Sequence, residues 1–170
     1  MKRILSFWYL SAVLINIIAI SNNVQAQVTE DWATRYNGPS SGADQSNAIV
    51  VDNFGNVYVA GYSDGSTPFW DYATIKYDSV GVFQWVQRYN GSGSSFDVAY
   101  AIAVDHLGFI YVTGGSIGTG SNYDYLTIKY SSSGDTIWTR RYNGPKNGLD
   151  KAYSIVLDDT GNVYITGESE

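Results

Sequence analysis

The sequence predicts an all-β fold, a partial β-propeller of four-stranded antiparallel blades preceded by a signal peptide. Three observations support this prediction. A 53-residue unit repeats along the chain, each unit holds four short apolar runs separated by turn residues, and the N-terminus is basic and then apolar. Gly and Tyr are abundant, with 18 and 15 copies, while apolar residues at helical spacing are rare. This composition favours many short strands joined by turns.

The first 26 residues are typical of a secretory signal peptide. Lys2 and Arg3 precede an apolar run over residues 4–20, and small residues at Val24 and Ala26 predict cleavage after Ala26. An uncleaved membrane anchor is the alternative, but cleavage is favoured because the apolar run is at the short end of what spans a bilayer and a cleavage site follows it. We therefore expect an exported mature chain, secreted or held at the cell surface.

Charge and cysteine content narrow the class of partner. Removal of Lys2 and Arg3 leaves 8 basic residues against 16 acidic ones, a net charge of −8. An acidic surface repels phosphate backbones, so we expect no nucleic acid partner. No basic amphipathic stretch indicates membrane binding after cleavage. The sequence contains no cysteine, so disulfides are excluded and packing alone must hold the fold.

The repeat defines the organisation of the chain. Residues 44–96 and 97–149 align without a gap and are identical at 24 of 53 positions. A further copy starts at Asp150, and the end of an earlier copy precedes Asp44. The chain therefore divides into a signal peptide (1–26), an outer strand with the turn into the first blade (27–43), blade repeat 1 (44–96), blade repeat 2 (97–149) and an incomplete blade repeat 3 (150–170).

Each repeat predicts two tight hairpins joined by a variable loop. In the first repeat, the turn at 52–55 joins the first two apolar runs and the turn at 78–81 joins the last two. The link between the second and third runs is about ten residues long and differs most between copies. The result is a four-stranded antiparallel sheet with strands expected at 48–51, 56–61, 72–77 and 83–89.

The predicted sheets are apolar on both faces. Val57 and Val59 point one way along the second strand while Tyr58 and Ala60 point the other way. A sheet without a polar face must be covered on both sides. Sheets that repeat every 40–50 residues and stack face to face are propeller blades. The Val- and Ala-rich first strand fits the inner edge, and the more polar fourth strand fits the outer edge.

The repeat resembles a known family. The segments DYATIKYDSVGVFQWVQRYNG (71–91) and AIAVDHLGFIYVTGGS (101–116) are similar to the SBBP repeat, the bacterial beta-propeller repeat. The resemblance extends over essentially all of residues 30–170. It implies exported or cell-surface bacterial proteins with propeller modules, and it implies no shared activity.

The repeated Trp and Arg residues predict structural contacts. The motif RYNGP indicates the end of an outer strand followed by the turn to the next blade. Asn-Gly is typical of tight turns, and Pro fits a position whose backbone N–H is not needed for hydrogen bonding to a neighbouring strand. We expect the Trp residues and their Arg-Tyr neighbours to pack at the seam between blades. These residues are Trp32, Trp85, Trp138, Arg35, Arg88 and Arg141.

The repeated aspartates favour structural roles over a metal site. Asp52, Asp105 and Asp158 each precede a hairpin glycine, as in calcium loops, but the copy at 105–109 supplies a single side-chain oxygen ligand. A carboxylate that caps its own turn is the favoured interpretation. Asp residues at the start of the first and third strands are expected to bond turns or the Arg of RYNG. No metal or cofactor is expected.

No catalytic set is evident. His106 is the only histidine and lies in a turn, so neither a Ser-His-Asp nor a Cys-His arrangement can be assembled. A carboxylate pair for glycoside chemistry is left open, because any two Asp residues can meet in space. The favoured function is a noncatalytic scaffold or binding surface. The alternative is part of a propeller-fold polysaccharide-active hydrolase or lyase.

The variable loops are the candidate binding surface. Residues 62–70 and 115–123 differ between copies and carry aromatic residues beside small polar ones, which suits an extracellular protein or glycan partner. The alternative is that these aromatic residues pack under their own loops. The candidates are Tyr62, Phe69, Trp70 and Tyr123.

The number of blades encoded by the sequence does not determine how the propeller ring is completed. Propellers close with about four to eight blades, more than this sequence encodes. We expect a piece of a larger propeller, with ring closure by further blades in the same chain; self-association of several copies is the alternative. The sequence does not specify the ligand, the ring size or the oligomeric state.

Overall fold

The structure is a computed structural model that describes residues 30–65 and 69–170. The predicted signal peptide (1–26) and residues 66–68 of the first variable loop lie outside the described residues. All regular secondary structure in the described part of the chain is β-strand. None of its segments forms a helix long and apolar enough to cross a membrane.

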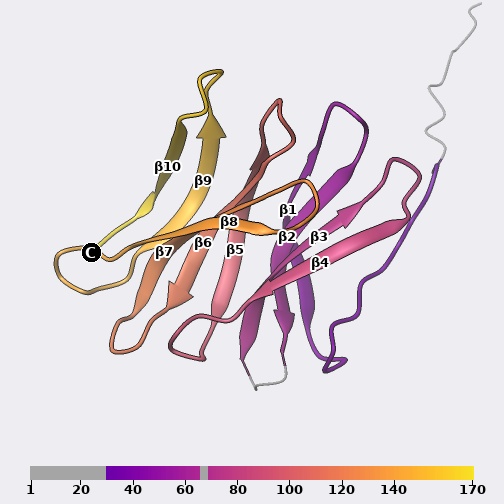
Figure 1. Cartoon of the computed structure of the whole chain (residues 1–170). Helices are drawn as coiled ribbons and strands as arrows, with labels where there is room; N and C mark the ends of the chain where they lie inside the picture. Colours follow the sequence, from indigo (N-terminus) through magenta and orange to yellow (C-terminus); the bar gives the residue numbers. More distant parts are fainter. Residues whose placement is uncertain (1–29, 66–68) are drawn as a thin grey trace, which may run out of the picture. The chain divides into compact units, whose positions relative to one another are not determined.

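The strands form two four-stranded antiparallel sheets and one two-stranded sheet (Figure 1). Neighbours in each sheet are consecutive in the chain, so the predicted four-stranded antiparallel blades are confirmed. The first sheet contains β1 (Asp44–Val51), β2 (Val57–Asp64), β3 (Trp70–Tyr77) and β4 (Phe83–Tyr89); the second contains β5 (Asp97–Val104), β6 (Ile110–Ile117), β7 (Tyr123–Tyr130) and β8 (Thr136–Tyr142); the third contains β9 (Lys151–Leu157) and β10 (Val163–Glu168).

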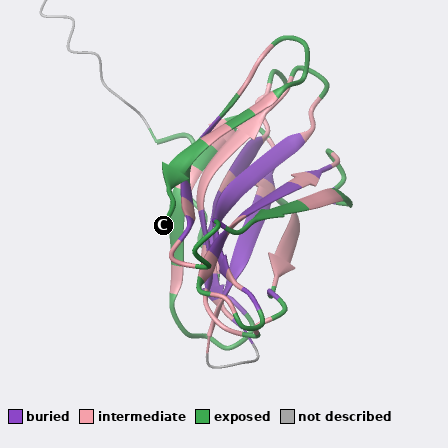
Figure 2. Ribbon diagram, turned by 90° about the vertical axis from the view of Figure 1, so that its left-hand side faces the viewer, coloured by how far each residue is buried: buried purple, intermediate pink, exposed green. Residues whose placement is uncertain are grey.

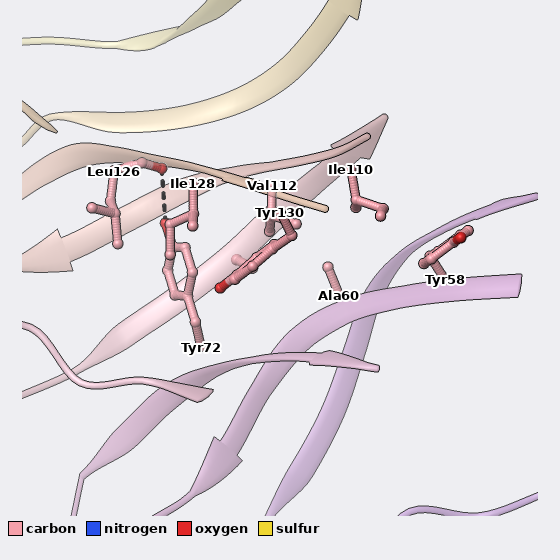
Figure 3. Packing of buried hydrophobic residues seen from close by; sticks show 9 residues of the cluster. Tyr58, Ala60, Tyr72, Ile110, Val112, Leu126, Ile128 and Tyr130 are labelled. Carbon is pink, nitrogen blue, oxygen red and sulfur yellow. Dashed lines mark hydrogen bonds between the residues drawn. The ribbon is translucent and has the colours of Figure 1, made fainter. Parts of the chain in front are cut away.

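The sheets stack face to face, and the main core lies between the first two. Tyr58 and Ala60 on β2 are fully buried against the second sheet, as the alternation along this strand predicts. The hydroxyl of Tyr72 crosses the seam and donates a hydrogen bond of 3.2 Å to the carbonyl of Leu126 (Figure 3). This bond satisfies a buried polar atom inside an otherwise apolar core. The buried cluster contains Tyr58, Ala60, Tyr72, Ala99, Ile110, Val112, Leu126, Ile128 and Tyr130.

The first strands form the crowded edge of the stack. Between neighbouring sheets, the most extensive strand contacts are those of β5 with β1 and of β5 with β9, whereas β4 and β8 make no comparable contact with a neighbouring sheet. The middle strands β2, β3, β6 and β7 are mostly buried, whereas β8 and β1 are largely exposed (Figure 2). The first strand therefore takes the inner position of a blade and the fourth the outer position.

Each first strand contains a β-bulge. Pairing with the second strand passes over Asn47, Tyr100 and Tyr153, which occupy equivalent positions 53 residues apart. A bulge leaves one residue without a partner and turns its side chain in a new direction. In each blade, the side chain at this bulge position is therefore turned away from the regular strand pairing at the inner edge.

The expected outer strand before the first blade is not a strand. Residues 31–36 form no sheet ladder with any other described residue. The physical reason is that a ladder needs a neighbouring strand, and no described residues form the three strands that should precede this segment. The segment instead lies on the free face of the first sheet, where Trp32 and Tyr36 pack against Val57, Ile75 and Tyr77.

Candidate functional site

The turn between blades is held by one carboxylate. The backbone N–H of Gly91 donates a 2.6 Å hydrogen bond to Asp97, the first residue of β5. Gly144 and Asp150 form the same 2.6 Å bond one repeat later. The same contact recurs between Gly38 and Asp44 at 2.9 Å. The backbone N–H of the glycine in RYNG therefore binds the aspartate at the start of the next blade. This contact explains why the RYNG motif recurs at the spacing of the repeat.

The arginine of RYNG joins three strands of its own blade. Arg141 on β8 bonds the Ser116 hydroxyl and carbonyl on β6, and its Nε lies 2.8 Å from Asp124 on β7. Arg88 makes the matching contacts with Ser63 and Asp71 in the first sheet. Three strands are thus fixed at the end of the blade that carries the variable loop.

The aspartates of the first hairpin are saturated by their own turn. Asp158 accepts hydrogen bonds from the backbone N–H groups of Thr160 and Asn162, and from the side chains of Thr160, Asn162 and Tyr164. These bonds hold the pKa of Asp158 well below its usual range, with the Asn162 side chain as the largest cause. Asp52 and Asp105 accept the corresponding bonds from their turns and from the tyrosine six residues later. Their oxygens are committed to the turn, which leaves little capacity for a cation.

Trp32 and Trp85 cover the second hairpin of the next blade. Trp85 on β4 donates from its indole N–H to the carbonyl of Ser132, and its ring packs 6.2 Å from Tyr130. Lys76 donates to the same carbonyl at 3.0 Å. Trp32 sits on the first blade in the same way, while Trp138 packs 6.1 Å from Tyr111 of its own sheet. Arg35 is exposed and makes no side-chain hydrogen bond to other described residues.

Three of the four candidate loop aromatics lie together at the first seam. Tyr62 on β2 stacks on Trp70 of β3, with ring centroids 4.4 Å apart. Phe96, from the turn before β5, packs edge-on against Trp70 at 5.0 Å and against Phe69 at 5.1 Å. These side chains are partly exposed, so the cluster closes the seam and still presents aromatic surface.

The fourth candidate, Tyr123, lies at the second seam. Lys151 covers its ring, with Nζ 4.5 Å from the ring centroid. Gly115 replaces the equivalent of Tyr62 here, and a Cβ at this glycine would lie 2.9 Å from Tyr123. The structure therefore does not bring Tyr123 into direct contact with the Trp70 cluster.

The bulge residues join the two seams. Tyr100 packs against Tyr153 with ring centroids 5.2 Å apart, and Tyr153 donates a hydrogen bond of 2.5 Å to Glu168. Asn47, the bulge residue of the first blade, donates to the carbonyl of Ala99. We use the name inner aromatic site for Tyr62, Trp70, Phe96, Tyr100, Tyr123 and Tyr153.

Tyr100, Tyr123 and Tyr153 of this site remain neutral hydroxyls because their pKa values are raised. The hydrogen bond to Glu168 raises the pKa of Tyr153 to about 12, and burial raises the pKa of Tyr123 to about 12. Burial is also the largest cause of the raised pKa of Tyr100, with Glu168 and Tyr62 adding to it. At neutral pH the site therefore offers aromatic faces and protonated hydroxyl groups, which can donate or accept hydrogen bonds.

The described residues offer no metal centre. No three His, Asp or Glu side chains within residues 30–65 and 69–170 lie close enough together to hold an ion. His106 is exposed in the turn between β5 and β6, apart from the inner aromatic site. The chemistry available at the site is stacking and hydrogen bonding.

Comparison with known families agrees with this architecture. The model of the family described as Beta-propeller repeat, SBBP, matches residues 31–69, 84–120 and 137–170. The chain belongs to the SBBP beta-propeller repeat family. A search of curated proteins finds no match to the chain.

The SBBP matches follow the contacts seen in the structure. Each begins at or beside an outer-strand tryptophan and runs into the next blade. The Gly–Asp turn bond and the Trp seam contact both cross this boundary. A matched unit therefore contains the Gly91–Asp97 turn bond that joins one blade to the next, whereas Ser132, the partner of Trp85, lies outside the matched residues.

Sequence reasoning missed half of the inner aromatic site. Phe96, Tyr100 and Tyr153 lie in the turn and the first strand, which the alignment assigns to the constant framework. A usable indication was present, because the position of Tyr100 and Tyr153 holds Asn47 in the first SBBP repeat. Such variation inside a framework strand is expected where a side chain is not constrained by packing.

Asp97 and Asp150 hold equivalent positions, yet their carboxyl pKa values shift in opposite directions. Burial between two blades is the largest cause of the raised pKa of Asp97. The hydrogen bond from the Ser169 hydroxyl is the largest cause of the lowered pKa of Asp150. A raised folded-state pKa contributes stability below the unfolded value of about 3.9, and that stability is lost as pH rises through the folded pKa. A lowered pKa contributes stability above about 3.9, which is lost as pH falls.

We therefore expect Asp97→Asn and Asp150→Asn to respond to pH with opposite sign. The stability lost by Asp97→Asn relative to the unmodified chain should shrink as pH rises from about 3 to 7, whereas the loss from Asp150→Asn should grow. Urea unfolding followed by circular dichroism at several pH values measures both. Two slopes of the same sign would contradict the assignment.

Proposed function

We propose that this SBBP chain is an exported, noncatalytic binding module and that its inner aromatic site takes an extracellular glycan. The repeated polar side chains favour a scaffold, because they hydrogen-bond to the turns and to neighbouring strands of the blades. The observation that carries the proposal is the pair Tyr100 and Tyr153, which the bulges turn out of the sheet pairing at the inner edge. Tyr153 is 47% exposed, so its ring is available to a ligand.

The chemistry of the site suits a sugar ring. Tyrosine rings offer apolar faces for the C–H faces of a pyranose, and their hydroxyls pair with sugar hydroxyls. Gln45 and Asn47 lie on the same inner strands and add amide groups, while Glu168 adds an acceptor. The exported chain, with 8 basic and 16 acidic residues, has a net charge of −8, which disfavours acidic polysaccharides. A neutral glycan is therefore the proposed ligand.

Replacement of Tyr153 by Ala tests the binding site. We expect the affinity for a neutral oligosaccharide that binds the unmodified chain to fall about tenfold, since a stacked aromatic contributes about 1–1.5 kcal/mol. A neutral-glycan array identifies the oligosaccharide, and isothermal titration calorimetry measures the loss. Tyr142→Ala is the matched control, because Tyr142 is 50% exposed on the outer strand β8.

These measurements distinguish the location of the binding site from the proposed binding function. Equal losses in the two variants would show that glycans bind elsewhere on the module. Binding of extended peptides together with an empty glycan array would replace the glycan by a protein partner. Turnover of a polysaccharide by the purified chain would sink the noncatalytic proposal.

Export is tested on the chain expressed from its complete reading frame. Cleavage after Ala26 leaves a mature N-terminus at Gln27, and intact-mass spectrometry of the exported fraction detects it. A chain that stays in the cytoplasm with residues 1–26 attached would contradict export. A membrane-bound chain of full mass would instead support the anchor alternative.

A further inference from the structure

Four Asn-Gly pairs lie in the turns between blades. Asparagine before glycine is the pair most prone to deamidation, because the backbone nitrogen of a residue without a side chain reaches the amide carbon of the asparagine most easily. The sequence alone gives no reason to distinguish the four pairs, but their backbone contacts differ. The pairs are Asn37–Gly38, Asn90–Gly91, Asn143–Gly144 and Asn147–Gly148.

The glycine nitrogen is held in place in the three RYNG pairs. Each glycine is buried, and its N–H donates to the aspartate that begins the next blade, at 2.6 Å for Gly91 and Gly144 and at 2.9 Å for Gly38. The nitrogen must leave this bond, lose its proton and turn toward the side-chain amide before it can react. The nearby carboxylate also opposes the build-up of negative charge on that nitrogen. The three RYNG pairs are therefore protected while the turn stays folded.

The pair Asn147–Gly148 lacks this restraint. Gly148 is partly exposed, and its N–H donates to no acceptor among the described residues. Ser95 is the equivalent residue in the turn before β5, and its N–H also has no acceptor within residues 30–65 and 69–170. The unbonded nitrogen is therefore a feature of the turn itself, since it recurs before a blade that has all four strands.

The side chain of Asn147 ties the turn to the second variable loop. Its Nδ2 donates to the carbonyl of Gly120 at 3.2 Å, and its Oδ1 accepts a 2.6 Å hydrogen bond from Asn143. Asn147 is exposed and has a φ of 52°, whereas the same position holds Ser41 with a φ of 53° and Ser94 with a φ of 42°. The turn therefore requires a left-handed residue at this position, and serine satisfies that requirement in the other two turns.

We propose that Asn147 is a site of spontaneous deamidation in the folded chain, and that the aspartates of the turns protect the other three Asn-Gly pairs. The nitrogen of Gly148 loses its proton to hydroxide and forms a bond to the side-chain carbonyl carbon of Asn147. The amide nitrogen takes up a proton and leaves as ammonia, which produces a cyclic imide. Water then opens the imide at either carbonyl carbon and yields aspartate or isoaspartate. The net reaction consumes water and releases ammonia, with no change of oxidation state.

The modification removes the tie between the turn and the loop. A carboxylate has no hydrogen to donate to the carbonyl of Gly120, and its charge repels that oxygen. Isoaspartate also lengthens the backbone of a tight turn. Residues 118–122 should therefore become more mobile after modification, while the bond between Gly144 and Asp150 stays in place. This consequence goes beyond glycan binding and holds whether or not the inner aromatic site takes a sugar.

Peptide mapping by mass spectrometry tests the site on the chain expressed from its complete reading frame. The folded chain is incubated at mildly alkaline pH and digested with trypsin, which places the four pairs on separate peptides. Asn147 should be converted at least about tenfold faster than Asn90 or Asn143, since a protected pair reacts only in the small fraction of molecules whose turn has opened. The cleavages that separate the pairs follow Arg35, Arg88, Arg141 and Lys146.

The same chain unfolded in urea is the reference for this measurement. Without the turn contacts, the four Asn-Gly pairs should react at similar rates. Conversion of Asn90 as fast as that of Asn147 in the folded chain would overturn the proposal. Conversion of Asn147 only after unfolding would overturn it as well.

Replacement of Asn147 by Ser separates the chemistry from other changes during incubation. This variant carries the residue that Ser94 supplies in the turn before β5, so we expect it to keep the fold. Hydrogen exchange over residues 118–122 should accelerate with incubation time in the unmodified chain and stay constant in Asn147→Ser. The same time course in both chains would show that the loop loosens for a reason other than deamidation.

Amide hydrogen exchange measured by NMR tests the protection without any substitution. The N–H groups of Gly38, Gly91 and Gly144 should exchange slowly, because each is buried and bonded to a carboxylate. The N–H of Gly148 should exchange close to the rate of an unfolded chain. Rapid exchange at the three RYNG glycines would remove the basis for their protection and refute the proposed selectivity.

Discussion

Replacement of Gly114 by Ala is expected to destabilise the chain by about 3 kcal/mol or more, the upper range for overpacking a well-packed core. Gly114 lies on β6 opposite the bulge at Tyr100, and its backbone is pressed against β5. A Cβ at this position would lie 2.1 Å from the Val98 carbonyl and 2.7 Å from the Tyr72 hydroxyl. One neighbour is backbone and the other is buried in the seam, so neither can move aside cheaply.

Urea unfolding followed by circular dichroism measures this loss. Gly120→Ala is the control, because Gly120 has a φ of 76° and nothing within 4 Å of an added Cβ. It should lose only about 1 kcal/mol, the cost of holding a non-glycine residue in the left-handed region. Equal losses in the two variants would show that backbone conformation, and not contact with β5, is what Gly114 provides.

The requirement for glycine recurs with the bulge. An added Cβ at Gly61 or Gly167 would lie 1.9 Å from the carbonyl of Gln45 or Lys151. The glycine that ends the YVAG, YVTG and YITG motifs is thus needed for close approach of two strands. The bulge and the glycine opposite it act together, and their combined effect is to turn Tyr100 and Tyr153 toward the inner edge.

Much of the fold could be predicted because its determinants are local and repeated. The 53-residue register located every hairpin, and alternation along residues such as Val57 and Tyr58 showed that both faces are buried. The sheet order followed from the short turns, because consecutive strands joined by a few residues pair with each other. The SBBP resemblance and the structure therefore agree on the architecture.

The parts that sequence reasoning missed depend on contacts between segments far apart in the chain. A bulge is a mismatch in pairing between two strands, so alternation along β5 alone does not reveal that Tyr100 is unpaired. Ser63 and Ser116 are ordinary strand residues until the arginine 25 positions later reaches them. Residues 31–36 have the pattern of an outer strand but cannot be one without the strands beside them.

The second large effect is expected at Arg141. Arg141→Met should destabilise the chain by about 3 kcal/mol or more, because it leaves the carboxylate of Asp124 buried without its partner. The side chain of Asp124 is 4% exposed and lies 2.8 Å from Arg141, so water cannot replace the lost cation readily. Ser116 loses its two guanidinium hydrogen bonds in the same step.

A double-mutant cycle isolates the ion pair from the rest of the loss. Asp124→Asn added to Arg141→Met should recover about 1–2 kcal/mol, because it removes the unpaired charge while keeping the size of the side chain. Additive effects of the two substitutions would contradict a direct interaction. Arg140→Met is the matched control, since Arg140 is exposed, donates to the carbonyl of its neighbour Thr139 and lies over the ring of nearby Trp138, so its loss should change stability by about 0.5 kcal/mol or less.

The position of this arginine links stability to the proposed binding site. Arg141 joins β6, β7 and β8 at the end of the blade where Tyr123 begins β7. Loss of the clamp should therefore loosen Tyr123 and the Lys151 side chain that covers it before the rest of the sheet unfolds. Hydrogen exchange on Arg141→Met should show faster exchange around residues 118–124 than around 126–130, which stay packed in the seam. Uniform acceleration across β7 would mean that the clamp supports the whole blade and has no particular role at the site.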